Sequence, residues 1–334
     1  MLDTVACGAA FGAALAVAAV HQPQVIVSQL SLTNFHMLES FLAAAASSAL
    51  FTAVVQATGY ATFPPRSFSS TGLLGTSLDG NLLGGLLQGA GMALSGACAG
   101  TVFAQNGSGI RSSFHALGGA MVGGIVWTGF LRPALQRRRK PQNTTTQKLT
   151  VDRRLGLGRT TTLLLLETVF VAAIGVAASS SSSTMMSRTQ GPVHPVTGGL
   201  LIGLAQLFSI LLRKTMLGTS TAFEEFGDSF WWLAGGARTT RPSHKNMLFA
   251  ASLALGSYLV SLRFPTLITN GGMDSESSPA RVALGGALLA IGSRMAGGCT
   301  SGHGISGISL MSVSSFVTVA AMFAGGIGVT SALG

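Results

Sequence analysis

Apolar stretches long enough, or nearly long enough, to cross a membrane recur along the whole chain. A helix of about 20 apolar residues spans a hydrocarbon core of about 30 Å. Only 9% of the 334 residues are Asp, Glu, Lys or Arg, against roughly 25% in soluble domains, so a water-facing surface cannot be built. We therefore predict an all-α, polytopic membrane protein with about nine transmembrane helices. The stretches are residues 5–20, 37–57, 82–104, 113–131, 161–178, 196–212, 246–262, 282–298 and 312–333.

One further stretch, residues 217–234, mixes charge with aromatic residues. It contains Glu224, Glu225 and Asp228 beside Trp231 and Trp232, which is typical of a short amphipathic or re-entrant helix. Glycine is abundant, at 45 residues, and small residues let helix backbones approach closely in lipid.

The positive charge is concentrated in one loop. Of a net charge of +10, nine Lys or Arg and a single acid, Asp152, lie between Arg132 and Arg159. A basic loop beside apolar spans indicates a cytoplasmic connector under the positive-inside rule. We therefore expect no nucleic-acid partner, and the bilayer itself is the surface that this chain meets.

The two ends of the chain repeat one another. Gly84-Gly85, Gly91, Gly96 and Cys98 recur at an offset of 201 as Gly285-Gly286, Gly292, Gly297 and Cys299. At an offset of 202, Gly100 matches Gly302, Ser112-Ser113-Phe114 matches Ser314-Ser315-Phe316, and Gly123-Gly124-Ile125 matches Gly325-Gly326-Ile327. We predict a first repeat at 1–131, a basic cytoplasmic loop at 132–160, a linking transmembrane helix with a serine-rich loop at 161–195, and a second repeat at 196–334.

A single span between two four-span halves would turn the second half upside down, which makes the repeat an inverted one. Basic residues support this topology: the connectors on the side of the basic loop hold Arg66, that loop, Arg213, Lys214, Arg238, Arg241 and Lys245. The opposite side holds only Arg111, Arg188, Arg263 and Arg281. The N-terminus is then cytoplasmic and the C-terminus outside, in a plasma or inner membrane. Transporters with inverted halves bind substrate where the halves meet.

Each repeat carries a cysteine among glycines. Cys98 lies between Gly96 and Gly100, and Cys299 between Gly298 and Gly302. Glycine loosens the helix there and exposes backbone N–H groups, which favour anions. A thiol beside them can contact a sulfur atom or, as thiolate, act as a nucleophile. The alternative is that small residues serve only close packing.

The remaining candidates have a functional and a structural interpretation each. Cys7, on the first span, has no cysteine counterpart in the second repeat and is typical of packing. Arg294 lies deep in its span and could draw an anion towards Cys299, or reach back to the interface. His303 could donate to an anion, or be a buried histidine with satisfied hydrogen bonds. No metal-ligand spacing links the three cysteines, so we expect neither metal nor cofactor.

At these residues the sequence resembles the YeeE/YedE sulfur-transport family. The closest match is GSRMAGGCTSGHGISG at 292–307, and GAGMALSGACAG at 89–100 resembles its first-half counterpart. The resemblance implies nine spans in an hourglass-shaped bundle with a pseudo-two-fold axis in the membrane plane. It also implies a central path with three cysteines, which Cys98 and Cys299 match and to which Cys7 is a plausible third, and a small soluble sulfur-carrier partner in some organisms.

The leading hypothesis is transport, not catalysis, of thiosulfate or a related small sulfur-containing anion along a cysteine-lined path. One alternative is a membrane sulfurtransfer protein that forms a persulfide on Cys98 or Cys299. A selenium-compound transporter and a structural or assembly protein are the others.

Overall fold

In the computed structural model, the described residues are 1–138, 149–181, 192–235, 242–265 and 278–333, and their regular elements are all helices, with one isolated bridge between Thr150 and Ser312. The first half contains α1 (Leu2–Val17), α2 (Pro23–Leu30), α3 (His36–Ala57), α4 (Asp79–Ser95), α5 (Thr101–Gly107), α6 (Arg111–Val126), the π-helical η1 (Trp127–Leu131) and α7 (Arg132–Arg138). Then come α8 (Val151–Leu155) and α9 (Arg159–Ser181). The second half contains α10 (Pro195–Arg213), α11 (Thr221–Ala234), α12 (Lys245–Arg263), α14 (Pro279–Ala296), the π-helical η3 (Thr300–Gly307) and α15 (Val313–Leu333).

Six of the described helices are long and apolar enough to cross a membrane, and the bent pair of α14 and η3 makes a seventh. Each of the nine predicted stretches contains a helix, but α1 has 16 residues and α4 has 17. α1 is apolar but shorter than a full span, and α4 is both short and less apolar. The glycines explain the shortfall in α4, because its helix ends at Gly96, in the middle of the predicted stretch.

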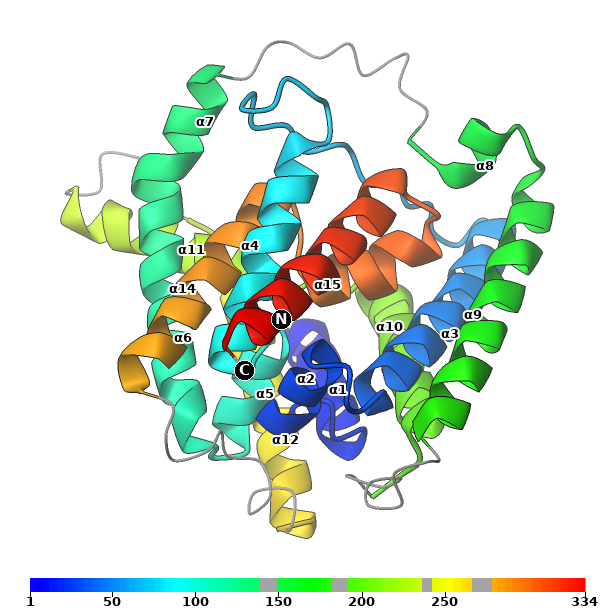
Figure 1. The fold of residues 1–334 in the computed structure, drawn as a ribbon, viewed down its shortest axis with the longest axis horizontal. Helices are drawn as coiled ribbons and strands as arrows, with labels where there is room; N and C mark the ends of the chain where they lie inside the picture. Colours follow the sequence, from blue (N-terminus) through cyan, green and yellow to red (C-terminus); the bar gives the residue numbers. More distant parts are fainter. Residues whose placement is uncertain (139–148, 182–191, 236–241, 266–277, 334) are drawn as a thin grey trace.

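Helices α4 and α14 cross at the centre of the bundle (Figure 1) through glycines of the two repeats. Gly84 faces Gly292, and Gly91 faces Gly285. A Cβ placed on Gly84 or Gly91 would lie 2.6 Å from the carbonyl oxygen of the facing glycine, which no real side chain tolerates. Glycine is therefore required for this close crossing, as in other membrane helix pairs.

The other helices of the two halves also pack in matching pairs. α4 packs on α15 while α14 packs on α6, and α1 packs on α12 while α10 packs on α3. In each case a helix of one half contacts a helix of the other. The hydrophobic core is consequently shared between the halves rather than divided into two.

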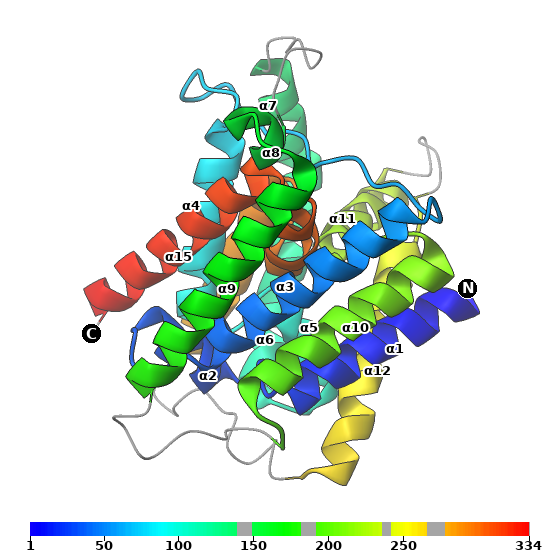
Figure 2. The same cartoon turned by 90° about the vertical axis from the view of Figure 1, so that its right-hand side faces the viewer.

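The connecting region differs in part from its prediction. The first residues of the predicted basic loop are helical: α6, η1 and α7 run on without a break from Arg111 to Arg138. α9 lies on the outer face of α3, at the edge of the bundle (Figures 1 and 2). Most of the predicted serine-rich loop lies outside the described residues. The chain ends lie on opposite sides of the molecule in Figure 2.

Candidate functional site

The two cysteine loops, residues 96–100 and 297–302, begin in the same way. α4 is capped by Gly96 with φ 61°, and α14 is capped by Gly297 with φ 83°. Both values are in the left-handed region that glycine adopts without a steric cost. After each cap the chain passes through a cysteine into a short helical segment, α5 or η3. The sequence predicts that the helix is loosened beside each of these cysteines, and both helices end there.

These breaks bring the two loops together. A small cavity of about 40 Å³ is lined by Cys98, Gly100 and Thr101 from the first loop and by Thr300 and Ser301 from the second. Its remaining lining is almost entirely apolar and includes Phe11, Leu15, Val20, Met37, Phe41 and Ile305. Straight helices would place the two thiols near opposite faces of the membrane. The breaks instead bring both cysteine loops to one interior cavity.

Cys299 has hydroxyl groups on two sides. Its buried Sγ lies 3.4 Å from Oγ1 of Thr219 and 3.3 Å from Oγ of Ser301. Thr219 is fully buried in the connection between α10 and α11, and a Cβ on Gly100 would lie 3.6 Å from its hydroxyl. Thr219 therefore lies between the two cysteine loops, a role that the sequence does not signal because no repeat or motif marks this residue.

Cys98 has a less polar environment. Its backbone N–H donates to Oγ1 of Thr101 at 2.7 Å, and the Thr101 N–H donates to the Cys98 Sγ at 3.4 Å. These bonds close one turn at the start of α5. The thiol otherwise faces the apolar cavity.

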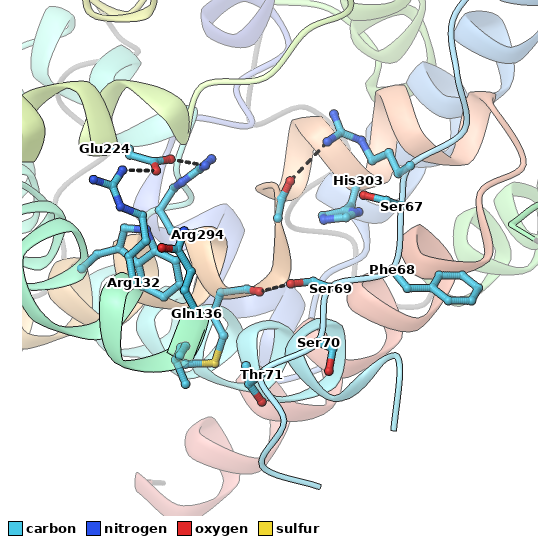
Figure 3. Close-up of a pocket in the computed structure, with 15 residues that line it drawn as sticks. Ser67, Phe68, Ser69, Ser70, Thr71, Arg132, Gln136, Glu224, Arg294 and His303 are labelled. Carbon is cyan, nitrogen blue, oxygen red and sulfur yellow. Dashed lines mark hydrogen bonds and ion pairs between the residues drawn. The ribbon is translucent and has the colours of Figure 1, made fainter. Parts of the chain in front are cut away.

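A second, larger cavity of about 320 Å³ adjoins the Cys299 loop (Figure 3). Polar and charged groups dominate it: Arg66, Arg132, Glu224, Arg294 and His303 line it together with residues 67–71. Cys299 lies between the two cavities, since Gly297 and His303 line the polar one and Thr300 and Ser301 line the apolar one.

Arg294 is paired in this cavity. Its guanidinium forms an ion pair with Glu224, which also binds Arg132 at 2.8 Å (Figure 3). Arg132 in turn binds Asp228 at 2.6 Å. Two cations thus meet two carboxylates, and the charge predicted to draw an anion is already compensated. Sequence reasoning missed this because Glu224 belongs to α11, about 70 residues earlier in the chain.

His303 is buried with both ring nitrogens in hydrogen bonds. Nε2 lies 3.2 Å from the Ala296 carbonyl oxygen, and Nδ1 lies 2.9 Å from Oγ of Ser315. Since a carbonyl only accepts, Nε2 carries the proton, and in the neutral ring Nδ1 accepts from Ser315. This arrangement matches the structural interpretation of His303, with a ring that holds η3 against the end of α14 and the start of α15.

Cys7 lies apart from the other two cysteines. It is fully buried in α1, and its Sγ donates to the Phe208 carbonyl of α10 at 3.9 Å. It lines neither of the two cavities described above. The structure therefore places Cys98 and Gly100 on the apolar cavity, and Cys299 with Gly302 in the loop that supplies Thr300 and Ser301 to the same cavity, whereas Cys7 packs between α1 and α10.

Arg66 is the charged residue of the site that the sequence did not single out. It was grouped with the cytoplasmic connectors, yet it lines the polar cavity and donates from Nη1 to the Gly297 carbonyl at 3.3 Å. Within the described ranges, no group of three His, Cys, Asp or Glu side chains could hold a metal ion.

The fold and the site together define a multi-pass helical membrane protein with broken helices that meet in its interior, which is the organisation of a transporter. The chain belongs to the sulphur transport family, whose family model matches residues 19–328. The resemblance to YeeE/YedE proteins is confirmed.

Two similar proteins have names that bear on function. The thiosulfate transporter TsuA of Spirochaeta thermophila is 26% identical over 261 residues, which are 72% of this chain and 73% of that protein. A "Probable transporter" of Xylella fastidiosa (strain Temecula1) is 31% identical over 144 residues, which are 42% of this chain and 94% of that protein. The second relative therefore corresponds to less than half of this chain.

Proposed function

We propose that this protein carries thiosulfate, or a related small sulfur oxyanion, across the membrane between its two cysteine loops. The observation that supports the proposal is the meeting of the two cysteine loops at one interior cavity, which Cys98 lines from the first loop and Thr300 and Ser301, next to Cys299 in the chain, line from the second. A cavity with three arginines adjoins the second loop. Family membership supports the transport of sulfur compounds, and the name of the Spirochaeta relative supports thiosulfate as the substrate.

The two cavities form successive parts of the proposed path. An anion in the polar cavity lies beside Arg66 and next to the Cys299 loop, in which the thiol has Thr219 and Ser301 as hydroxyl neighbours. Beyond Cys299, the apolar cavity of about 40 Å³ is far smaller than the polar cavity of about 320 Å³. The step from Cys299 to Cys98 therefore requires the broken helices to move apart.

The halves are proposed to be inverted repeats that together make nine spans. Support comes from the reciprocal contacts at the centre, where Gly84 faces Gly292 and Gly91 faces Gly285. In the repeat, Gly84 corresponds to Gly285 and Gly91 corresponds to Gly292. Exchanging the two halves therefore turns the contact of Gly84 with Gly292 into the contact of Gly285 with Gly91, as a two-fold axis would. Since the earlier glycine of α4 faces the later glycine of α14, the two equivalent helices run in opposite directions.

The proposed orientation places the basic segment 132–160 and the N-terminus in the cytoplasm, and the C-terminus outside, in the cell membrane. The concentration of Lys and Arg in that segment supports it, because cytoplasmic loops carry this excess. Arg132, at the start of the segment, lines the polar cavity, so the cavity belongs to the cytoplasmic end of the path.

Growth on thiosulfate as the sole sulfur source tests the proposal in a host that lacks sulfate and thiosulfate uptake. The wild-type protein is expected to restore growth. Cys98→Ala and Cys299→Ala each remove a contact to a charged ligand, so we expect uptake of radiolabelled thiosulfate to fall at least about tenfold.

Immunoblots of the membrane fraction control for the amount of each variant. Equal growth of both variants and the wild type would exclude a role for the thiols. A wild-type protein that supports growth no better than the empty vector would exclude thiosulfate as the cargo.

A further inference from the structure

Arg66 belongs to the segment between α3 and α4, which has no regular helix, but its backbone is fixed to the second half. Its N–H donates to Oγ of Ser312 at 2.9 Å, and its carbonyl accepts from Oγ of Ser314 at 3.1 Å. Both serines lie at the start of α15. These two bonds therefore hold an arginine of the first half at a fixed position beside the cysteine loop of the second half.

The guanidinium lies against the glycines of the Cys299 loop. A Cβ on Gly298 would come within 3.1 Å of Nη1, and a Cβ on Gly302 within 3.3 Å of Nη2. The same Cβ on Gly302 would lie 3.7 Å from the Cys299 Sγ. Nη2 and the thiol therefore both lie next to Gly302, which places no Cβ between them.

Arg66 has no carboxylate partner among the described residues. Arg132 and Arg294, the other arginines of the cavity, are paired with Glu224 and Asp228. In the part of the chain that the structure describes, Arg66 forms no ion pair, and its buried Nε has no hydrogen-bond partner. Arg66 is half-buried, and a partly desolvated cation without a counter-ion is stabilised by an anionic ligand in the adjoining cavity.

We propose that Arg66 binds the oxygen end of the transported anion and thereby turns its sulfur end towards Cys299. This inference rests on the proposed function and adds the residue that selects an oxyanion and orients it. The planar guanidinium fork suits two oxygens of one oxyanion. The thiol of Cys299 and the hydroxyls of Thr219 and Ser301 lie on the far side of Gly302, where the terminal sulfur of thiosulfate would lie.

Uptake kinetics in proteoliposomes test the proposal with Arg66→Gln and Arg66→Lys. We expect the KM for thiosulfate to rise about tenfold or more in Arg66→Gln, because a charge-assisted hydrogen bond is lost. Arg66→Lys keeps the charge but not the fork, so its KM is expected to lie between those of Arg66→Gln and the wild type. Arg111→Gln, which removes an exposed arginine at the start of α6, is the matched control and should keep the wild-type KM.

A binding measurement accompanies the kinetics, because loss of a buried arginine could also impair folding. Thiosulfate at saturating concentration is expected to raise the melting temperature of the detergent-solubilised wild-type protein, and to raise that of folded Arg66→Gln far less. Should Arg66→Gln fail to fold, Arg66→Lys decides. A wild-type KM and a wild-type thermal shift in the folded variant overturn the role of Arg66. A wild-type protein that neither takes up thiosulfate nor is stabilised by it contradicts the proposed function instead.

Discussion

The two cysteine loops begin with the same backbone conformation but have different chemical surroundings. Gly96 and Gly297 cap their helices in the same left-handed conformation, and a cysteine follows each cap. Cys299 is then surrounded by two hydroxyl groups and an arginine, while Cys98 faces an apolar cavity. The same glycine cap therefore gives the two loops the same backbone start, and the neighbouring side chains give each loop its own chemistry.

This difference assigns the two loops to different parts of the proposed cycle. The polar cavity of about 320 Å³ is lined by Gly297 and His303, on either side of Cys299 in the chain, so an anion there has polar partners close to this loop. Cys98 instead lines the apolar cavity of about 40 Å³, where a charged ligand would lose its hydration. The Cys299 loop is suited to binding, and the contact between the loops is suited to gating.

Repeat-equivalent glycines offer the sharpest comparison of the loops. Gly302→Ala would bring a Cβ within 3.3 Å of the Arg66 Nη2, whereas Gly100→Ala would meet nothing closer than 3.6 Å. Displacement of a binding group by a few tenths of an ångström weakens an oriented contact, so we expect the KM of Gly302→Ala to rise roughly threefold to tenfold. Gly100→Ala should stay within about twofold of the wild type.

Thiosulfate uptake by the two variants at equal membrane levels checks this prediction. If both alanines had the same effect, the proposed asymmetry between the loops would be wrong.

Much of this arrangement could be predicted from the sequence. The cysteines at equivalent positions and the glycines around them indicated two broken helices, and the structure has both. Arg66 could not be predicted, because its contacts join residues more than 230 positions apart and no motif marks it. The pairing of Arg294 with Glu224 was missed for the same reason: the position of an arginine along a helix does not reveal the partner that another helix supplies.

Cys7 gives the smallest expected effect and tests the limits of the path. Its thiol donates to the Phe208 carbonyl at 3.9 Å, a long and weak hydrogen bond, and lines neither of the two cavities. Alanine at this position should therefore leave the KM and the maximal rate of thiosulfate uptake within about twofold of wild type, since the cost of one weak hydrogen bond is about 0.5 kcal/mol. Loss of uptake comparable to that of Cys299→Ala would extend the path to α1.

The central claim, that the anion passes intact between the two thiols, is tested most directly with thiosulfate labelled separately at its outer, sulfane sulfur and at its inner, sulfonate sulfur. Proteoliposomes containing the purified protein would be filtered and the two labels counted inside. Transport of the intact anion predicts that both labels enter at the same rate, and that both rates fall together in Cys98→Ala and Cys299→Ala. Entry of the sulfane label alone would contradict it and would indicate transfer of sulfur through a cysteine persulfide.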